Sequence, residues 1–174
     1  MYQRRHAGRC PRQVVVYKTS EFRYDEINGC HDAWRAVEAL DLIHVQQDTS
    51  WRGIQLDAVQ RPGRYPCHRG SYLPIGGTEC LLWTQGNAPT AVGGADFYKE
   101  GKGIPSPLLI CRYSGHSSWN DICAGILGLT KMNWNTDSLY GPLPVTIRYA
   151  SILARTIKRI PQLGSKPYEF RYFM

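Results

Sequence analysis

The segment Val14-Val15-Val16-Tyr17, with its polar exit Lys18-Thr19-Ser20, decides the fold. A short run of β-branched residues is typical of a central strand that is covered on both faces. Apolar residues then recur at helical spacing in 27–37, and Leu42-Ile43-His44-Val45 has the pattern of a second strand after a short connection. Strand, helix and strand in this order predict a β-α-β unit and an α/β fold.

Downstream, the pattern changes to short strands joined by tight turns. Tyr72-Leu73-Pro74-Ile75 and Cys80-Leu81-Leu82-Trp83-Thr84 flank Gly76-Gly77, which predicts an antiparallel hairpin. Residues 86–107 are rich in Gly and Pro, so we expect a surface loop before a strand at 108–113. These segments, added to the β-α-β unit, predict one mixed sheet.

Two further helices close the chain. Ser118-Trp119-Asn120-Asp121 has the form of a capping box, and the amphipathic pattern behind it continues to Leu129. A last helix is expected after Gly141-Pro142-Leu143-Pro144, where proline suits the first turn, and it should run to about Ile160 and stop at Pro161.

The last helix is apolar on one side and cationic on the other. At 100° per residue, its apolar residues gather on one face and its arginines align on the opposite face. The apolar set is Ala150, Leu153, Ala154, Ile157 and Ile160, and the cationic set is Arg148, Arg155 and Arg159. Such a stripe is either a solvated helix face or a track for phosphates. Because a helix N-terminus carries unpaired amides and partial positive charge, Arg148 adds to a site already disposed toward anions.

The composition fits a single folded domain. The chain has 174 residues, of which 43% are hydrophobic and 20% charged, and this balance excludes a wholly disordered protein. No apolar run approaches the ~20 residues of a membrane helix and the N-terminus lacks a signal-peptide core, so we expect a cytoplasmic protein without a membrane segment. Six cysteines without zinc-finger spacing predict reduced, mostly buried thiols. The net charge is +7, and we expect a basic N-terminal segment, 1–12, ahead of a domain that spans 13–174.

Five segments, taken together, resemble the PIWI domain of prokaryotic Argonaute proteins. In family order they are 14–20, 64–71, 82–86, 129–135 and 143–150. The fourth and fifth are specific in combination, whereas the first alone would carry no weight. The resemblance implies a ribonuclease H-like fold, with a mixed sheet flanked by helices, of which 13–174 would be the C-terminal part. The family's first strands would precede residue 1, so we expect a second polypeptide, or the rest of an excised chain, to supply them.

The same resemblance bears on catalysis. Active members of the family use acidic or histidine groups to hold two divalent metals around the scissile phosphate. The third and fourth of these positions fall on Thr19 and Ser151. Neither hydroxyl brings the anionic charge that hard divalent ions require. The resemblance therefore implies a protein that binds without cutting.

The binding residues that the resemblance implies lie near the last helix. Those expected to approach the first phosphates of a guide strand are Lys131, Asn133, Asn135, Thr136, Arg148, Tyr149 and Arg155. The terminal carboxylate of Met174 is expected to help hold Mg²⁺ at the 5′ phosphate of the guide. Loop capping is the alternative for the two asparagines, a solvated helix end for Lys131, and core packing for the chain terminus.

The leading hypothesis is a catalytically inactive Argonaute assembly in prokaryotic defence. It would hold a short RNA or DNA guide and recognise a complementary target strand by base pairing. One alternative is a metal-dependent nuclease whose metals are held entirely by segments outside this chain. Another is a scaffold that recruits a separate effector. One sequence does not distinguish RNA from DNA, because the contacts to 2′-hydroxyl groups are not visible in it.

Overall fold

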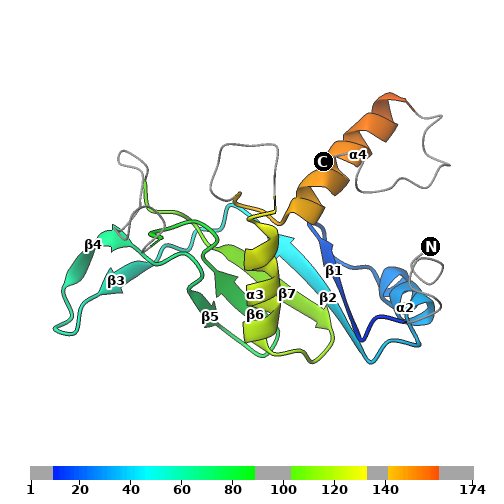
Figure 1. Cartoon of the computed structure of the whole chain (residues 1–174), viewed down its shortest axis with the longest axis horizontal. Helices are drawn as coiled ribbons and strands as arrows, with labels where there is room; N and C mark the ends of the chain where they lie inside the picture. The colour runs from blue at the N-terminus through cyan, green and yellow to red at the C-terminus, as the bar shows by residue number, and fades with distance from the viewer. Residues whose placement is uncertain (1–9, 89–102, 133–140, 161–174) are drawn as a thin grey trace.

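The computed structural model describes residues 10–88, 103–132 and 141–160. Its centre is a five-stranded sheet with the order β1-β2-β7-β6-β5 (Figure 1). The strands are β1 (Gln13–Lys18), β2 (Ala39–Gln46), β5 (Tyr72–Pro74), β6 (Glu79–Leu82) and β7 (Leu108–Ser114). β1 and β2 are parallel, and the other neighbours are antiparallel. The predicted α/β fold with a mixed sheet is confirmed.

The β-α-β unit is present, with two differences from expectation. Its helix α2 (Tyr24–Ala33) ends before Val37, because Trp34 leaves the helical region with φ −115° and ψ 22°. No residue of α2 is buried. β1, expected at the centre of a sheet, forms the edge beside β2, and Val14, Val15 and Val16 are only half-buried. No other strand of the described residues pairs with its second edge.

Two hairpins lie toward the other end of the sheet. β5 and β6 pair antiparallel, with Tyr72 opposite Leu82, as the sequence predicts. A separate two-stranded sheet joins β3 (Ile54–Leu56) to β4 (Pro62–Pro66) and projects from one end of the molecule (Figure 1). Asp57 holds its turn, because Oδ1 accepts the backbone N–H groups of Val59 and Arg61, both at 2.9 Å.

The hydrophobic core lies between the sheet and α3 (Trp119–Leu129). Ile122, Cys123 and Ile126 of this helix pack against buried side chains of β2, β6 and β7. The capping prediction is confirmed, since the Ser118 hydroxyl accepts the Asp121 N–H at 3.1 Å. Burial of apolar surface between helix and sheet is the main stabilising contribution here.

A buried carboxylate fixes the start of α3. Asp41 of β2 is 0% exposed and accepts hydrogen bonds from the Ser117 N–H at 3.2 Å and the Ser117 hydroxyl at 2.5 Å. Its Oδ1 lies 4.0 Å from Arg112 Nε, and the Arg112 guanidinium stacks 4.2 Å from the centre of the Trp119 ring. Gly115 has φ +106°, and a Cβ there would lie 2.2 Å from Asp41 Oδ1. Only glycine lets the chain pass so close to the carboxylate.

The last helix, α4 (Val145–Arg159), begins at the sheet and extends away from it (Figure 1). Its buried residues, Val145, Ile147 and Tyr149, lie near its start. The expected apolar face on Ala150, Leu153, Ala154, Ile157 and Ile160 is at most half-buried, and Ile160 is 47% exposed. Beyond the first turns, no described helix or strand covers that face.

Three further expectations concern the cysteines, membrane-spanning helices and the boundary of the N-terminal segment. All six cysteines are free, but only Cys80 and Cys123 are buried, so the expectation of mostly buried thiols is wrong for the other four. None of the helices in the described part of the chain has the length and apolar character needed to cross a bilayer. The boundary between 1–12 and 13–174 stays a prediction, because residues 1–9 lie outside the described residues.

Candidate nucleic-acid interface

The end of α3 is tied to the approach to α4 through Thr130. Its hydroxyl donates to the Leu127 carbonyl at 2.6 Å, and its own carbonyl accepts the Gly141 N–H at 2.8 Å. Arg69 Nη2 donates to the Leu127 carbonyl at 3.1 Å and to the Thr130 hydroxyl at 2.5 Å. These bonds satisfy carbonyl groups that a helix end otherwise leaves unpaired. The two ends of segment 131–140 are therefore held together.

The bend before α4 brings neither a side-chain cap nor an acidic residue to the first turn of the helix. The Thr84 hydroxyl fixes the bend by donating to the Pro142 carbonyl at 2.7 Å. Pro144 is the N-cap residue, and it provides no side-chain hydrogen bond to the first turn. The first turn also carries no acidic residue. Its backbone N–H groups and the helix dipole therefore favour a negatively charged ligand.

The cationic side chains of α4 are exposed. Arg148, Arg155, Lys158 and Arg159 belong to a helix without any Asp or Glu. Within the described ranges, no hydrogen bond or ion pair joins these side chains to another residue. A hollow of about 290 Å³ lies against this helix, and its lining includes Ile152, Arg155, Thr156 and Arg159. Two of the three predicted arginines thus face one hollow, while Arg148 lies closer to the helix start.

The structure places some of the predicted binding residues and not others. Lys131 is exposed just after α3, and Arg148 and Arg155 are exposed on α4. Tyr149 is only 5% exposed, and its contact with a guide nucleic acid stays a prediction. The remaining predicted residues, Asn133, Asn135, Thr136 and Met174, lie outside the described residues.

The two positions where the resemblance expects catalytic ligands are Thr19, directly after β1, and Ser151 on α4, and β1 and α4 contact each other (Figure 1). Thr19 is exposed directly after β1, and the Ser151 hydroxyl donates to the Ile147 carbonyl at 3.0 Å. Nearby, Lys18 Nζ lies 2.5 Å from Glu26 Oε2. The Arg23 backbone N–H and Lys18 lower the pKa of the Glu26 carboxyl. Two hydroxyl groups do not fit a site for two hard divalent ions.

Burial shapes the ionisation of Tyr17, which lies beneath this surface on β1. Burial, with the nearby Asp41 charge as a second cause, raises the pKa of Tyr17 from 10.0 to about 12. Its side chain packs against the core cluster. Tyr17 therefore stays neutral at physiological pH and contributes packing, not charge, to the region below Thr19.

The anchoring role of Arg69 has no counterpart in the sequence pattern. This residue lies in segment 64–71, which was noted for its resemblance and not for any contact. Its guanidinium reaches across the fold to Leu127 and Thr130, which are 58 and 61 residues away in the chain. No local pattern encodes such a contact. An arginine directly before Gly70, which has φ +94°, was the available signal of a constrained turn.

Comparison with known proteins identifies the fold. No protein-family model and no curated protein sequence matches the chain. Among solved structures, it is similar to Clostridium butyricum Argonaute bound to a guide DNA and a 19-mer target DNA, with a TM-score of 0.67 and 20% identity. That match covers 92% of this chain and 19% of the other. Aquifex aeolicus Argonaute matches with a TM-score of 0.56 and 17% identity, covering 90% of this chain and 19% of the other.

The chain therefore spans about a fifth of the length of the structures that it matches. At these identities the likeness concerns the fold. The mixed sheet, the covering helix α3 and the final helix α4 occur here in one α/β arrangement. The chain has an Argonaute-like fold that corresponds to the ribonuclease H-like PIWI domain.

Proposed function

We propose that this chain binds a short guide strand as part of an Argonaute-type assembly, in which the guide pairs with a complementary target. The observation that carries the proposal is the exposed basic face of α4 next to an uncapped helix start. Arg155 and Arg159 line the hollow on this helix. Phosphate contacts fix the position of a strand without reading its bases, so binding should depend little on guide sequence.

The first test is the nucleic acid that co-purifies with the intact assembly. The proposal expects a population of short strands, and sequencing them would report strand chemistry and length together. In the double variant Arg155→Gln/Arg159→Gln, recovery should fall about tenfold or more, because each lost phosphate contact weakens binding. Arg35→Gln is the matched control, since Arg35 is an exposed arginine after α2. Equal recovery from the double variant and the control would contradict the proposal.

We also propose that the assembly does not cut the target. Support comes from Thr19 and Ser151, where the resemblance expects carboxylate or histidine ligands. Hydroxyl groups supply neither the charge nor the affinity needed for two catalytic divalent ions. The measurement is incubation of the intact assembly, with guide and matched target, in Mg²⁺ or Mn²⁺. Cleavage with Thr19 and Ser151 unchanged would overturn this part and favour metals held by other segments.

A further part of the proposal concerns the polypeptide that completes the sheet. β1 has a free edge among the described strands, and the nearby α2 has no buried residue. Because an apolar strand edge readily pairs with another strand, we expect additional polypeptide to add along β1. Expression of residues 1–174 alone tests this. A monodisperse monomer with cooperative unfolding would count against the need for a partner, whereas aggregation relieved by co-expression would support it.

A further inference from the structure

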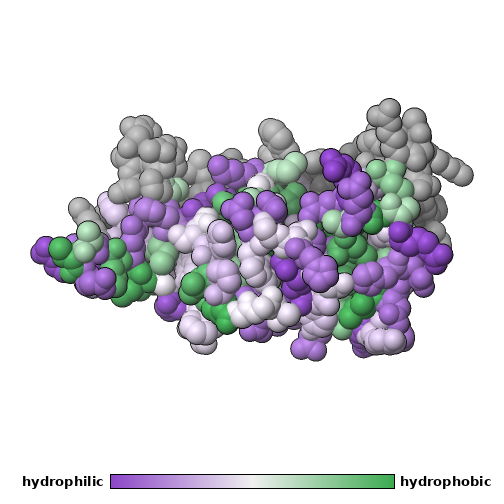
Figure 2. Space-filling view, turned by 90° about the horizontal axis from the view of Figure 1, so that it is seen from below, coloured by the Kyte–Doolittle hydropathy of each residue, from purple (hydrophilic) through white to green (hydrophobic). Residues whose placement is uncertain are grey.

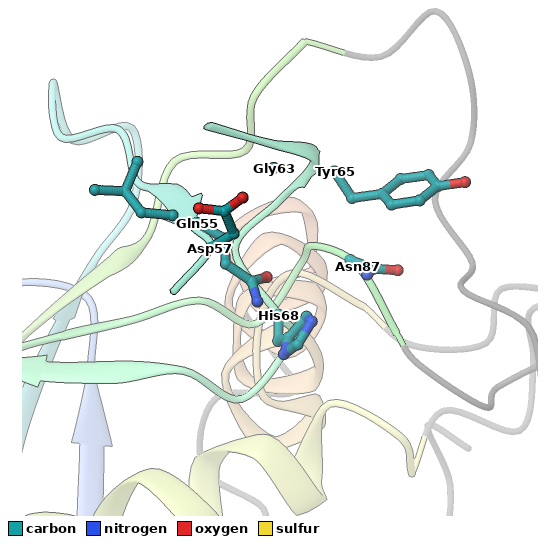
Figure 3. A pocket seen from close by; sticks show the side chains of 7 residues that line it. Gln55, Asp57, Gly63, Tyr65, His68 and Asn87 are labelled. Carbon is teal, nitrogen blue, oxygen red and sulfur yellow. The ribbon is translucent and has the colours of Figure 1, made fainter. Parts of the chain in front are cut away.

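A second pocket lies between the β3–β4 sheet and the segments around His68 and Asn87 (Figure 3). Its volume is about 180 Å³, and its lining residues are Gln55, Leu56, Asp57, Gly63, Tyr65, His68 and Asn87. An enclosed cavity of about 150 Å³ is enough to hold one benzene ring. The pocket is therefore large enough for one planar heterocycle and too small for a folded peptide segment.

Asn87 is held rigidly in the wall of this pocket. Its backbone N–H donates to the Cys67 carbonyl at 3.1 Å, and its carbonyl accepts the Arg69 N–H at 2.7 Å. The side chain is 2% exposed, and its Oδ1 has no hydrogen-bond partner among the described residues. A buried acceptor without a partner is costly, and native proteins usually pair such groups with protein, water or ligand. Because this oxygen is itself enclosed, Asn87 fixes the wall of the pocket, and contacts to a ligand are left to the exposed Gln55 and the half-buried His68.

Gln55 and His68 complete a polar lining. In Figure 3 the Gln55 amide points toward the His68 ring. Neither side chain forms a hydrogen bond with another residue of the described ranges. Together they offer both donors and acceptors, which is the chemistry that reads the edge of a nucleobase.

The acidic residue of the lining does not make the pocket a cation site. The Asp57 carboxylate accepts two backbone N–H groups of its own turn, and Arg61 Nε lies 3.7 Å from Oδ2. Its charge is thus already balanced. No group of three or more His, Cys, Asp and Glu residues that could hold a metal ion occurs in the part of the chain that the structure describes. A neutral, polar and planar ligand fits better than a metal.

The pocket lies close to the proposed strand path. Thr84 is hydrogen-bonded to Pro142 at the approach to α4, and Asn87 follows Thr84 by three residues. Three residues span at most about 11 Å even when fully extended. Successive bases in a helical strand are separated by about 3.4 Å. A nucleic-acid strand that reaches the bend before α4 would therefore span the distance from the bend to the pocket with about three successive bases.

We propose that this pocket takes one unstacked nucleobase of the nucleic-acid strand bound at α4 and contacts its edge through Gln55 and His68. The proposal rests on the proposed function, because it requires a bound strand. It adds a base contact to a site otherwise based on phosphates. Unstacked bases are read in this way in single-stranded nucleic acids, where the hydrogen-bonding edges are accessible.

The experiment scans the fluorescent base 2-aminopurine through a short 5′-phosphorylated strand bound to the intact assembly. Fluorescence anisotropy of an end label reports binding, and 2-aminopurine emission reports unstacking. We expect one position, or two adjacent positions, to brighten about threefold or more on binding, as for a base removed from its stack. Gln55→Leu should abolish this rise while changing the dissociation constant less than about threefold, since phosphate contacts dominate affinity. Asn120→Leu, on the exposed side of α3, is the matched control and should keep the rise.

The decisive variant is Gln55→Leu, because Gln55 is exposed and its substitution leaves the buried Asn87 wall in place. Binding without brightening at any position would overturn the pocket proposal and leave the proposed function intact. If the 2-aminopurine emission still rose in Gln55→Leu, the pocket proposal would be overturned as well. Failure of the unmodified assembly to bind any strand would instead refute the proposed function, and the pocket proposal with it.

Discussion

The middle of the sheet and the flank formed by β1, α2 and α4 are built differently. In the middle, β2, β6 and β7 pack with α3 around a closed core, and Ile43, Ile110 and Ile126 are 0% exposed. On the flank, α2 has no buried residue, and Tyr24 is 77% exposed. Figure 2 shows apolar surface toward this end and over the β3–β4 end. The middle carries its own stability, whereas the flank presents apolar and basic surface to other molecules.

The sharpest way to test this contrast is to remove a buried charge from the middle. Asp41→Ala leaves Ser117 without its acceptor and Arg112 without a nearby counter-charge. We expect a loss of about 3–5 kcal/mol in the free energy of unfolding, as for other broken buried pairs. The control is Asp32→Ala, which breaks an ion pair whose side chains are 77% and 79% exposed. Exposed pairs contribute about 0–1 kcal/mol.

Denaturant unfolding of both variants gives the comparison. Equal losses for Asp41→Ala and Asp32→Ala would show that the Asp41 network does not hold the start of α3 in place.

A matched pair of isoleucines measures the packing of the two regions. Ile126 on α3 is 0% exposed, whereas Ile157 on α4 is half-buried. Ile126→Ala should cost about 2–5 kcal/mol, because it removes buried methyl groups and leaves a cavity. Ile157→Ala should cost less than about 1 kcal/mol in the chain alone. Chemical denaturation of the chain alone, and then of the assembly, distinguishes the regions. A large loss from Ile157→Ala without a partner would mean that the flank already has a closed core.

A smaller effect is expected from the pH dependence of Tyr17. Burial raises its pKa to about 12, above the value of 10.0 in the unfolded chain. The folded state therefore holds the phenolic proton more tightly. The resulting stabilisation is complete below pH 10 and is lost as the pH rises toward 12. Tyr17→Phe lacks this titration, so its free energy of unfolding should fall less steeply over that range. Parallel pH profiles for the two proteins would contradict the assignment.

Much of the fold was accessible from local pattern. The strands at 14–17 and 42–45, the hairpin around Gly76-Gly77 and the cap at Ser118 follow from short-range rules, and the structure confirms them. The position of β1 at a sheet edge did not follow from its local pattern; it was expected only from the resemblance, whose first strands would precede residue 1. The run of β-branched residues in β1 is typical of a strand with both faces covered. The run carries no information on which other strands pair with its edges.

Of the candidate site, only the arginines that repeat along the last helix could be predicted from the sequence. Arg148, Arg155 and Arg159 recur at helical spacing, so their shared face could be predicted. The pocket could not be predicted, because it depends on long-range pairing: a bridge joins His68 to Asn87, and Gln55 lies on β3, which pairs with β4. Gly86 with φ +150°, before Asn87, is a weak local trace of this constraint. Long-range backbone pairing of this kind leaves no periodic signal in the sequence.

The most direct measurement of the central claim is the salt dependence of guide binding by the intact assembly. A logarithmic plot of the dissociation constant of a 5′-phosphorylated strand against salt concentration reports how many phosphates are neutralised. Our account predicts that Arg155→Gln lowers this slope by about one and weakens binding of all sequences alike, while Arg35→Gln leaves the slope unchanged. An unchanged slope in Arg155→Gln would contradict the assignment of α4 as the phosphate-binding surface.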